Sequence, residues 1–442
     1  MPRLPDGLGA WLAYLEALHP HGSAGIELGL GRVAAVKAAL DQRQTCPVIL
    51  VGGTNGKGST CAMLERILLV AGYRVGLYTS PHLLRYSERV RIDGLAVEDA
   101  SLCAAFARVE QARGDVALTY FEFGTLAAWE LFAAASLDAI ILEVGLGGRL
   151  DATNVYEPAC AIVTSIDLDH MAYLGADREA IGREKAGIFR AGTPAICGDP
   201  QPPRSLIDHA NGIGAGLQVL GADFGYLRQE QQQWLFWRCS DNAPKARDGR
   251  SEGATARRGG LAFPALRGEQ QLANAASALA ALDALHACLP VAMQDIRRGL
   301  IEVELPGRFQ VLPGRPTVVL DVAHNPQAAR ALAVNLAGMG FHRNTWALFG
   351  MLADKDIGGV IEALRGQITH WLPCTLEGCR GAGADFLAAC LRAREIAPLG
   401  EFASPATALA CALEKAGEDD RILAFGSFLT VAAALQELGR AR

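Results

Sequence analysis

The sequence has few lysines, no surplus of positive charge and no cysteine pair at metal-binding spacing. Its 442 residues include 41 Lys and Arg against 47 Asp and Glu, a formal net charge of −6. A chain without a basic excess is poorly suited to a polyphosphate backbone, so we expect no nucleic acid partner. The 11 cysteines form no CxxC motif, which argues against a structural zinc site. Because the N-terminal segment also lacks an export-signal pattern, we expect reduced thiols and a cytoplasmic protein.

Long apolar runs are also missing. The apolar run that most resembles a membrane-spanning segment, 422–435, is shorter than the ~18–20 residues that a membrane-spanning helix needs. Gly426 and Ser427 interrupt it. The run is better explained as a buried strand followed by a helix, and we expect no membrane association.

The apolar sequence that is present suffices for two domains. Hydrophobic residues make up 50% of the chain, and a single core usually stops growing near ~250–300 residues. Between 47 and 200 short β-rich runs alternate with helical patterns, and this rhythm restarts after 305. It is typical of βαβ units around a mostly parallel sheet. We predict an α/β fold with a large domain over 1–298 and a smaller α/β domain over 299–442.

One tract inside the first domain departs from this rhythm. Residues 228–262 combine an alternating strand pattern with a polar, glycine-rich stretch over 241–260. Such a stretch, which lacks large apolar side chains, is typical of a loop. We predict a hairpin insert with an exposed, mobile tip.

A glycine-rich loop between a strand and a helix predicts nucleotide binding. The loop, 51–60, has the sequence VGGTNGKGST. Its backbone N–H groups and the N-terminus of the following helix favour bound phosphate. Lys57 would contact the β- and γ-phosphate oxygens, and Ser59 or Thr60 would ligate Mg²⁺. The loop departs from the usual G-x-x-x-x-G-K-[ST] pattern, because Gly58 separates the lysine from the hydroxyl residues and valine stands at the first glycine position.

The helix after this loop has an apolar stripe. Leu64, Ile67, Leu68 and Ala71 recur at helical spacing, and Gly72 follows them. This pattern predicts a helix with one buried face that ends near the glycine.

Ionisable residues follow two later strands. Glu143 ends one apolar run, while Asp167, Asp169 and His170 follow the next, and Lys185 comes shortly after. Open parallel sheets place their ligands at the carboxyl ends of strands, and carboxylates there can hold Mg²⁺. Each residue alone is equally consistent with a helix cap or a core position. Their convergence beside a phosphate loop favours a functional site.

The second domain repeats the arrangement in the block DVAHNP. Asp321 follows a strand, Asn325 suits a helix N-cap and Pro326 suits the first helical position. Asp321 and His324 would lie at a strand-end edge that could face the nucleotide. Arg308 is a candidate cation for phosphate, although an ordinary surface arginine fits its position equally well.

These blocks together resemble the Mur ligase superfamily and, within it, the bacterial folylpolyglutamate synthases, which are often dihydrofolate synthases as well. The resemblance runs over nearly the whole chain, in GGTNGKGST, YTSPHLLRYSERVRI, LTYFEFGTLAA, ILEVGLGGRLDATN, VTSIDLDHMAYLG, REKAGIFR, LPGRFQ, DVAHNP, GMLADKD and GSF. The tract 241–260 matches none of them. The resemblance implies a P-loop-containing central ATPase domain, a smaller Rossmann-like C-terminal domain and an active site between them.

The resemblance also implies roles for individual residues. The implied ATP-binding residues are Thr54, Asn55, Gly56, Lys57, Gly58, Ser59, Thr60, Asn274, Arg308 and Asp321. The implied catalytic residues are Lys57, Glu143, His170, Lys185 and His324. The implied pocket for the pterin substrate contains His82, Thr119, Phe121, Asp151 and Ala152.

Two Mg²⁺ sites are implied in the same way. The first would use Ser59, Ser80 and Glu143, and the second Glu143, His170 and Lys185. In this family the lysine that matches Lys185 is typically carbamylated, which turns an ammonium into a carboxylate-like ligand. A monovalent cation is a further candidate cofactor.

Position alone suggests Lys355, Arg380 and Ser427 as contacts for glutamate.

The implied activity is ATP-dependent amide ligation through an acyl phosphate. L-glutamate would be added to dihydropteroate and to reduced folates, with ATP and Mg²⁺, by a monomer whose partners are these small molecules. Two alternatives stay open: a cell-wall ligase that joins amino acids to a UDP-sugar, and a P-loop nucleotide switch without ligase activity. The pterin-pocket blocks argue against the first alternative, and the block DVAHNP argues against the second.

Overall fold

A computed structural model describes residues 4–19, 27–229, 233–239 and 254–440. The chain forms two compact units. The first comprises Met1–Ala265 and Gln271–Val303, and the second Leu266–Gln270 and Glu304–Arg442. The division expected after residue 298 falls inside helix α10 (Met293–Glu302).

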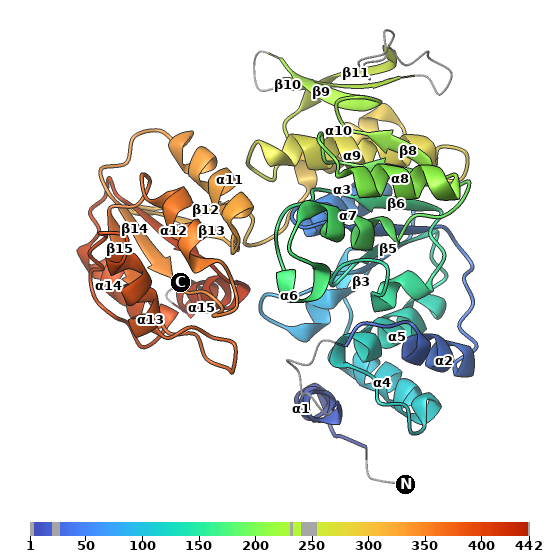
Figure 1. The fold of residues 1–442 in the computed structure, drawn as a ribbon, viewed down its shortest axis with the longest axis horizontal. Coiled ribbons are helices and arrows are strands. Elements are labelled where there is room, and N and C mark those ends of the chain that lie inside the picture. Colours follow the sequence, from blue (N-terminus) through green and yellow to red (C-terminus); the bar gives the residue numbers. More distant parts are fainter. Residues whose placement is uncertain (1–3, 20–26, 230–232, 240–253, 441–442) are drawn as a thin grey trace. The chain divides into compact units, whose positions relative to one another are not determined.

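An eight-stranded sheet forms the frame of the first unit (Figure 1). Its strand order is β4-β3-β2-β5-β1-β6-β7-β8. The strands that pair in parallel are β1 (Val48–Gly52), β2 (Val75–Tyr78), β5 (Ala139–Glu143), β6 (Cys160–Val163), β7 (Pro194–Cys197) and β8 (Gly216–Val219). One edge is antiparallel, made of β3 (Val90–Ile92) and β4 (Leu95–Ala96). The predicted α/β fold with a mostly parallel sheet is confirmed.

Helices cover both faces of this sheet. Alternate strand residues, such as Leu50 and Leu142, share one hydrophobic core with α1 (Leu8–Leu18), α2 (Gly31–Ala39), α4 (Asp99–Arg113), α5 (Tyr120–Ala133), α7 (Arg178–Ala186) and α8 (Arg204–Ile213). Helix α3 (Lys57–Val70) has no residue in that core, yet it contacts β1, β2 and β5. It therefore lies on the opposite face, because successive strand residues point to opposite sides of a sheet.

Helix α3 is buried on more than one side, which corrects the prediction of a single buried face. Its buried residues are Ser59, Thr60, Cys61, Ala62, Met63, Leu64, Glu65, Ile67 and Leu68. The sheet covers one side, and α10 packs on another. A Cβ at Gly299 of α10 would lie 2.7 Å from the Cα of Ile67. Periodicity within one helix cannot reveal this second neighbour, which comes from a distant segment of the chain.

Three antiparallel strands, β9 (Phe224–Arg228), β10 (Gln233–Cys239) and β11 (Ala254–Ala262), form a separate small sheet. The hairpin predicted within 228–262 corresponds to β10 and β11. The expectation of a loop is wrong for 254–260, because those residues pair with β10 and so form part of a strand. Residues 241–253 lie outside the described part of the chain.

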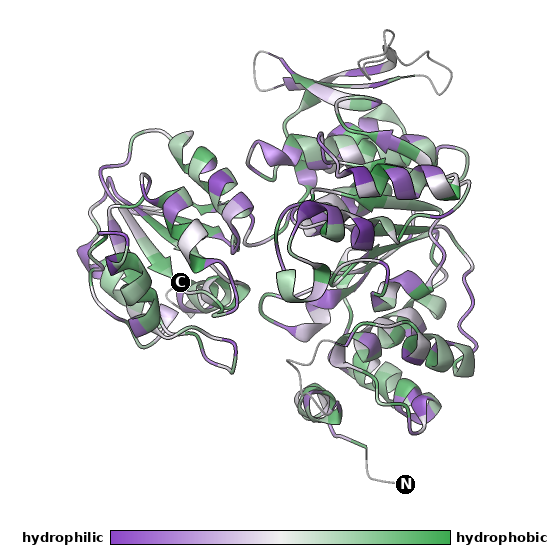
Figure 2. Ribbon diagram, in the orientation of Figure 1, coloured by the Kyte–Doolittle hydropathy of each residue, from purple (hydrophilic) through white to green (hydrophobic). Residues whose placement is uncertain are grey.

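The second unit holds a five-stranded sheet of order β12-β13-β16-β14-β15. Its strands are β12 (Gln310–Leu312), β13 (Thr317–Asp321), β14 (Thr345–Phe349), β15 (His370–Pro373) and β16 (Arg421–Phe425). Its helices are α11 (Pro326–Ala337), α12 (Ile357–Leu364), α13 (Ala384–Arg392), α14 (Pro405–Lys415) and α15 (Phe428–Arg440). The strands of the two larger sheets carry mostly hydrophobic residues (Figure 2). The run 422–435 is divided between β16 and α15, as predicted.

No helix within the described ranges is both long and apolar enough to cross a membrane.

Candidate functional site

The strand order of the first unit brings most of the predicted site residues to one edge of the sheet. Strands β2, β5, β1, β6 and β7 are parallel neighbours, so their carboxyl ends lie side by side. Ser80 follows β2, Glu143 ends β5, the glycine-rich loop follows β1, and His170 follows β6. Ligands bind at this edge in open parallel sheets.

The glycine-rich loop needs glycine at two positions. Gly56 has φ +93° and Gly53 has φ +138°, values that favour glycine. A Cβ at Gly56 would overlap the side-chain oxygen of Asn274, and one at Gly53 would overlap the hydroxyl of Thr164. Asn274, on α9 (Gln270–Ala284), is buried and donates to Gln271 Oε1 at 3.0 Å. The structure therefore brings Asn274 against the loop.

Lys57 is the first residue of α3, and its ammonium is held by the loop itself. Its Nζ donates to the carbonyl oxygens of Gly53 at 2.9 Å and Thr54 at 3.1 Å. Ser59 and Thr60 are buried in the first turn of the helix. Thr60 Oγ1 is a buried hydroxyl that has no hydrogen-bond partner among the residues that the structure describes. The N–H of Thr60 donates to Gly56 O at 2.9 Å, but the N–H groups that precede it at a helix start have no partner within the helix, so an anion can occupy the position in front of them.

Glu143 lies between the loop and the segment after β2. Its side chain is 4% exposed, and its Oε2 accepts a hydrogen bond from the backbone N–H of Ser80 at 3.1 Å. Burial raises the pKa of the Cys61 thiol, and the Glu143 carboxylate raises it further, while Lys57 lowers it. Glu143 and Lys57 therefore both act electrostatically on the start of α3.

Lys185 is buried at the end of α7, only 3% exposed. Burial lowers the pKa of its ammonium to about 7, and Lys57 lowers it further, whereas Asp169 and Asp151 raise it. These interactions place Lys185 among groups from the glycine-rich loop and from the segment after β6. His170, at the N-cap of α6 (Met171–Leu174), has φ +51°, and its Nε2 lies 4.0 Å from Asp169 Oδ2.

The side chains at this edge are suited to a metal whose other ligands come from phosphate. Among the residues that the structure describes, no three His, Cys, Asp or Glu side chains form a metal-binding group. Mg²⁺ is usually bound by one or two carboxylates, waters and substrate phosphates rather than by an all-protein cage. Glu143 with two serine hydroxyls fits that donor set. The second implied set contains an ammonium, so it fits a metal only when Lys185 carries a carboxylate.

The predicted pterin residues lie around the start of α5 and the segment after β5. The Phe121 ring packs on Gly145, where a Cβ would lie 2.6 Å from Cζ, and on the Tyr78 ring, with centroids 5.8 Å apart. Thr119 is the N-cap of α5, in a capping box with Glu122. The structure thus brings Thr119 and Phe121 onto one helix end.

Asp151 and Ala152 are buried in the segment after β5. The Asp151 carboxylate accepts from Leu146 N at 2.9 Å and from Thr153 N and Oγ1 at 3.0 and 2.6 Å. Burial raises the pKa of Asp151, and these hydrogen bonds oppose the shift. Asp151 therefore caps the short helix η2 (Ala152–Val155) and shapes this segment.

Sequence reasoning singled out His82 but missed Arg89. The Nε of Arg89 donates to His82 Nδ1 at 2.9 Å, and its guanidinium lies 5.0 Å from the Tyr86 ring centroid and 5.5 Å from that of Tyr120. Burial lowers the pKa of His82 to about 4, and Arg89 lowers it further, so the imidazole is neutral at pH 7. A basic residue near aromatic blocks was the available signal, but the segment of His82, Tyr86 and Arg89 meets Tyr120 only in the fold.

In the second unit, Asp321 and Arg308 are close to one another. Asp321 accepts backbone N–H bonds from Phe309 and Ala323, both at 2.8 Å. Burial raises the pKa of Asp321, while these bonds and Arg308 oppose the shift. The Arg308 guanidinium lies 4.9 Å from the Phe428 ring centroid.

His324 and the residues after it take the predicted local geometry. His324 Nδ1 lies 2.9 Å from the carbonyl oxygen of Val322, so Nδ1 carries the proton. Asn325 caps α11 by accepting from Ala328 N at 2.9 Å, and Pro326 is the first helical residue. The predictions for Asn325 and Pro326 are confirmed.

The three residues suggested for glutamate follow strands of the second sheet. Arg380 Nη2 forms an ion pair with Asp354 at 2.7 Å, next to Lys355. Ser427 is buried, and its hydroxyl accepts from Leu429 N at 3.1 Å, at the start of α15. All three lie at the carboxyl edge of this sheet, because β14, β15 and β16 are parallel.

Comparison with known proteins agrees with this geometry. Residues 51–197 match the Mur ligase middle domain, and residues 307–428 match the glutamate ligase domain of Mur ligases. The dihydrofolate synthase/folylpolyglutamate synthase of Escherichia coli is 44% identical over 445 residues, which cover 100% of this chain and 98% of that protein.

Two solved structures are similar over their whole length. Escherichia coli FolC in complex with DHPP and ADP has a TM-score of 0.89 and 44% identity, with 100% of both chains covered. A bifunctional folylpolyglutamate synthase/dihydrofolate synthase with Mn, AMPPNP and L-glutamate bound has a TM-score of 0.87 and 45% identity, with 99% of both chains covered. With this identity along its full length, the chain belongs to the dihydrofolate synthase/folylpolyglutamate synthase family of Mur ligases.

Proposed function

We propose that this protein is an ATP-dependent ligase that adds L-glutamate to dihydropteroate and to reduced folates. The observation that carries the proposal is the single sheet edge of the first unit, where the glycine-rich loop, Glu143 and Lys185 come together. A phosphate-binding loop beside metal-binding and titratable groups suits phosphoryl transfer. The cell-wall ligase and the nucleotide switch are not favoured, because the full-length relatives are named dihydrofolate synthase/folylpolyglutamate synthase.

ATP would bind with its phosphates at the N-terminus of α3. Backbone N–H groups of 56–59 would hold the phosphate oxygens, and the Lys57 ammonium would leave the loop carbonyls to contact them. Asn274 packs against the loop next to Gly56. In the second unit we assign Arg308, Asp321 and His324 to the same nucleotide.

Divalent metal would be held by the residues that fit it. Ser59, Ser80 and Glu143 would hold one Mg²⁺, and Glu143, His170 and a carbamylated Lys185 a second. When bound, Mg²⁺ would offset the negative charge that accumulates on the phosphates. The burial of Lys185 beside Lys57 supports the carbamate, because an added negative charge there relieves the repulsion between two ammonium groups. A monovalent cation belongs to the same proposal.

The reaction would pass through an acyl phosphate. A carboxylate oxygen of the pterin or folate substrate attacks the γ-phosphorus, the bond to the bridging oxygen breaks, and ADP leaves. The amino group of glutamate then attacks the activated carbonyl carbon, loses a proton and displaces inorganic phosphate. Lys57 would stabilise the charge during the first step. We assign the pterin to the pocket of His82, Thr119, Phe121, Asp151 and Ala152, and glutamate to the second unit near Lys355, Arg380 and Ser427.

The direct test is a reconstitution with purified protein, ATP, Mg²⁺, L-glutamate and dihydropteroate. We expect ADP release only when both organic substrates are present, and a product one glutamate heavier than dihydropteroate by mass spectrometry. ADP release that does not depend on the pterin would contradict the proposal. A monomeric state and a cytoplasmic location stay predictions from composition and resemblance.

Replacing Gly56 by alanine is expected to weaken ADP binding at least tenfold. Alanine at φ +93° costs roughly 1–2 kcal/mol, and its Cβ would displace Asn274 from the loop. Isothermal titration calorimetry measures the affinity. The matched control is Gly212→Ala on α8, where a Cβ meets nothing within 4 Å. Wild-type affinity in Gly56→Ala would mean that the loop does not hold the nucleotide.

Replacing Lys185 by alanine is expected to abolish ligation, and a small carboxylate such as acetate should restore part of it. Acetate would supply the carboxylate that the carbamate provides in the wild-type protein. The measurement is the ligation rate with and without acetate, together with a carbamate signal in ¹³C NMR of protein equilibrated with ¹³C-bicarbonate. Lys57→Ala is the control, since acetate cannot replace its positive charge. Absence of both rescue and signal would exclude the carbamate.

A further inference from the structure

The segment after β6 binds the glycine-rich loop through its main chain. The backbone N–H of Thr54 donates to Ser165 O at 2.6 Å, and the N–H of Asn55 donates to Ser165 Oγ at 3.2 Å. The hydroxyl of Thr54 donates to Asp167 O and accepts from Asp167 N, both at 3.1 Å. Ser165 and Asp167 therefore determine where the main chain of the loop lies.

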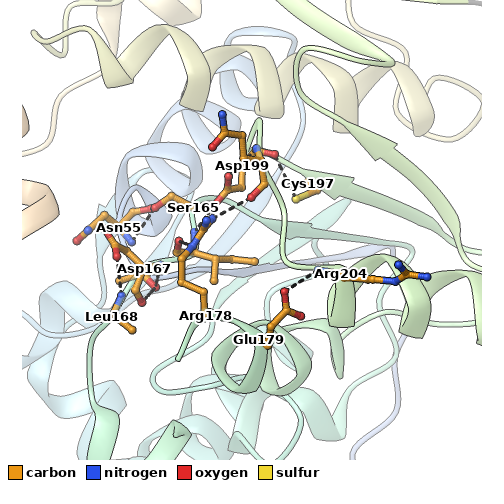
Figure 3. A network of polar contacts seen from close by, with 12 residues as sticks. Asn55, Ser165, Asp167, Leu168, Arg178, Glu179, Cys197, Asp199 and Arg204 are labelled. Carbon is orange, nitrogen blue, oxygen red and sulfur yellow. Dashed lines mark hydrogen bonds and ion pairs between the residues drawn. The ribbon is translucent and has the colours of Figure 1, made fainter. Parts of the chain in front are cut away.

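Ile166, between these two residues, is bound by the ion pair of Arg178 and Asp199, which Figure 3 labels. Its N–H donates to Asp199 Oδ2 at 3.0 Å, and its carbonyl accepts from Arg178 Nε at 3.0 Å. Arg178 Nη2 donates to the same Asp199 oxygen at 2.9 Å and to Gln201 O at 3.0 Å. The N–H and the carbonyl of Ile166 are thus bound by the side chains of Asp199 and Arg178, and these two side chains also bind each other.

The two side chains come from separate elements. Asp199 follows β7, the sheet neighbour of β6, and Arg178 is the first residue of α7, whose far end carries Lys185. The pair therefore joins the segment after β6 to the helix that presents Lys185. Arg178 is 40% exposed at its side chain, so burial of apolar surface does not account for its position.

We propose that Arg178 and Asp199 are positioning residues for the nucleotide: they fix the main chain of Ile166 and thereby the loop residues Thr54 and Asn55. The inference rests on the proposed function for the identity of the nucleotide, and on the hydrogen bonds for the coupling. Neither residue needs to touch the nucleotide. Groups that orient metal ligands from outside change metal affinity or activity by about 10- to 100-fold when they are replaced, and we expect an effect of the same order here.

Lysine cannot replace Arg178 in this role. The guanidinium donates from Nε to Ile166 O and from Nη2 to Asp199 at the same time, which requires a planar fork. A lysine would keep the ion pair and lose the hold on the carbonyl. Arg178→Lys therefore separates a positioning role from simple charge pairing.

The test compares Arg178→Gln, Arg178→Lys and Asp199→Asn with Arg113→Gln. Arg113, on α4, also joins a carboxylate, Glu110, to a main-chain carbonyl, Val116 O, but lies outside the site. We expect the three site variants to weaken ADP binding about tenfold and to raise the KM for ATP, with the KM for glutamate unchanged. Arg113→Gln should lower the melting temperature and leave ADP affinity unchanged.

Wild-type ADP affinity in the Arg178 variants would overturn the proposal, as would an equal loss of affinity in Arg113→Gln. If Arg178→Gln does not fold, Arg178→Lys and Asp199→Asn carry the test. The double variant Arg178→Gln/Asp199→Asn should bind ADP with the same affinity as the single variant that binds ADP less tightly. If the two losses of ADP affinity add up in the double variant, the joint role is contradicted. ADP binding requires no ligation, so a wild-type protein that binds ADP without ligating would refute the proposed function alone.

Discussion

Replacing Lys57 by alanine is expected to lower kcat for ligation by about 10³-fold, the scale on which a preorganised charge acts in phosphoryl transfer. The side chain already lies within the glycine-rich loop, where its ammonium contacts the carbonyls of Gly53 and Thr54. Those contacts are local, so their loss should not unfold the domain. Steady-state kinetics with saturating ATP, glutamate and dihydropteroate measures the effect.

The control for this variant is Lys415→Ala, at the exposed end of α14 in the second unit. It removes the same side chain away from the phosphate loop and should leave kcat unchanged. Circular dichroism and thermal melting should match the wild type for both proteins. Turnover of Lys57→Ala within a few-fold of wild type would remove the lysine from the phosphoryl-transfer step.

Replacing Glu143 by glutamine is expected to lower kcat by about 10²- to 10³-fold and to raise the Mg²⁺ concentration needed for half-maximal rate, since charge on a metal ligand contributes several kcal/mol. Glutamine has nearly the same shape, and its side-chain oxygen can still accept the N–H of Ser80. The loss should therefore reflect the missing charge rather than a displaced segment. Rates measured across a Mg²⁺ titration separate the two parameters.

Glu157→Gln is the matched control, because the side chain of Glu157 is 73% exposed and pairs only with Arg190 among the contacts that the structure describes. It should keep both the rate and the Mg²⁺ requirement of the wild type. An unchanged Mg²⁺ requirement in Glu143→Gln would argue that the carboxylate supports the Ser80 segment and binds no metal.

Glu143, His170 and the glycine-rich loop were found because each ends or follows a strand, whereas Ser80, Asn274 and the pterin residues came from the family resemblance. Glu143, His170 and the glycine-rich loop are polar interruptions at the ends of apolar runs, and parallel strands carry such interruptions to one edge. The contacts among them could not be predicted, because the order of strands in the sheet differs from their order in the chain. The pairing of β1 with both β5 and β6 sets Lys57 between Glu143 and the segment of His170.

Other features depended on partners that no local pattern reveals. Arg178 and Asp199 are 21 positions apart and belong to no nucleotide motif, yet they bind one peptide residue. Residues 254–260 have the composition of a loop but form a strand, since β10 offers a ladder of backbone hydrogen bonds. The hydrogen bonds of the Asp151 carboxylate to Leu146 and Thr153 likewise follow from no sequence pattern.

The α/β class, the phosphate loop before α3 and the capped start of α11 could therefore be predicted from the sequence. Hydrophobic periodicity, the positions of glycine and proline, and residue type were enough. Each of these depends on interactions within a few residues, which local sequence encodes directly. Three other features depend on which distant segments of the chain meet. They are the packing of α10 on α3, the ion pair that binds Ile166, and the cationic and aromatic groups around His82. That outcome follows from strand order and packing in the folded chain, where burial and hydrogen bonding act between residues far apart in sequence.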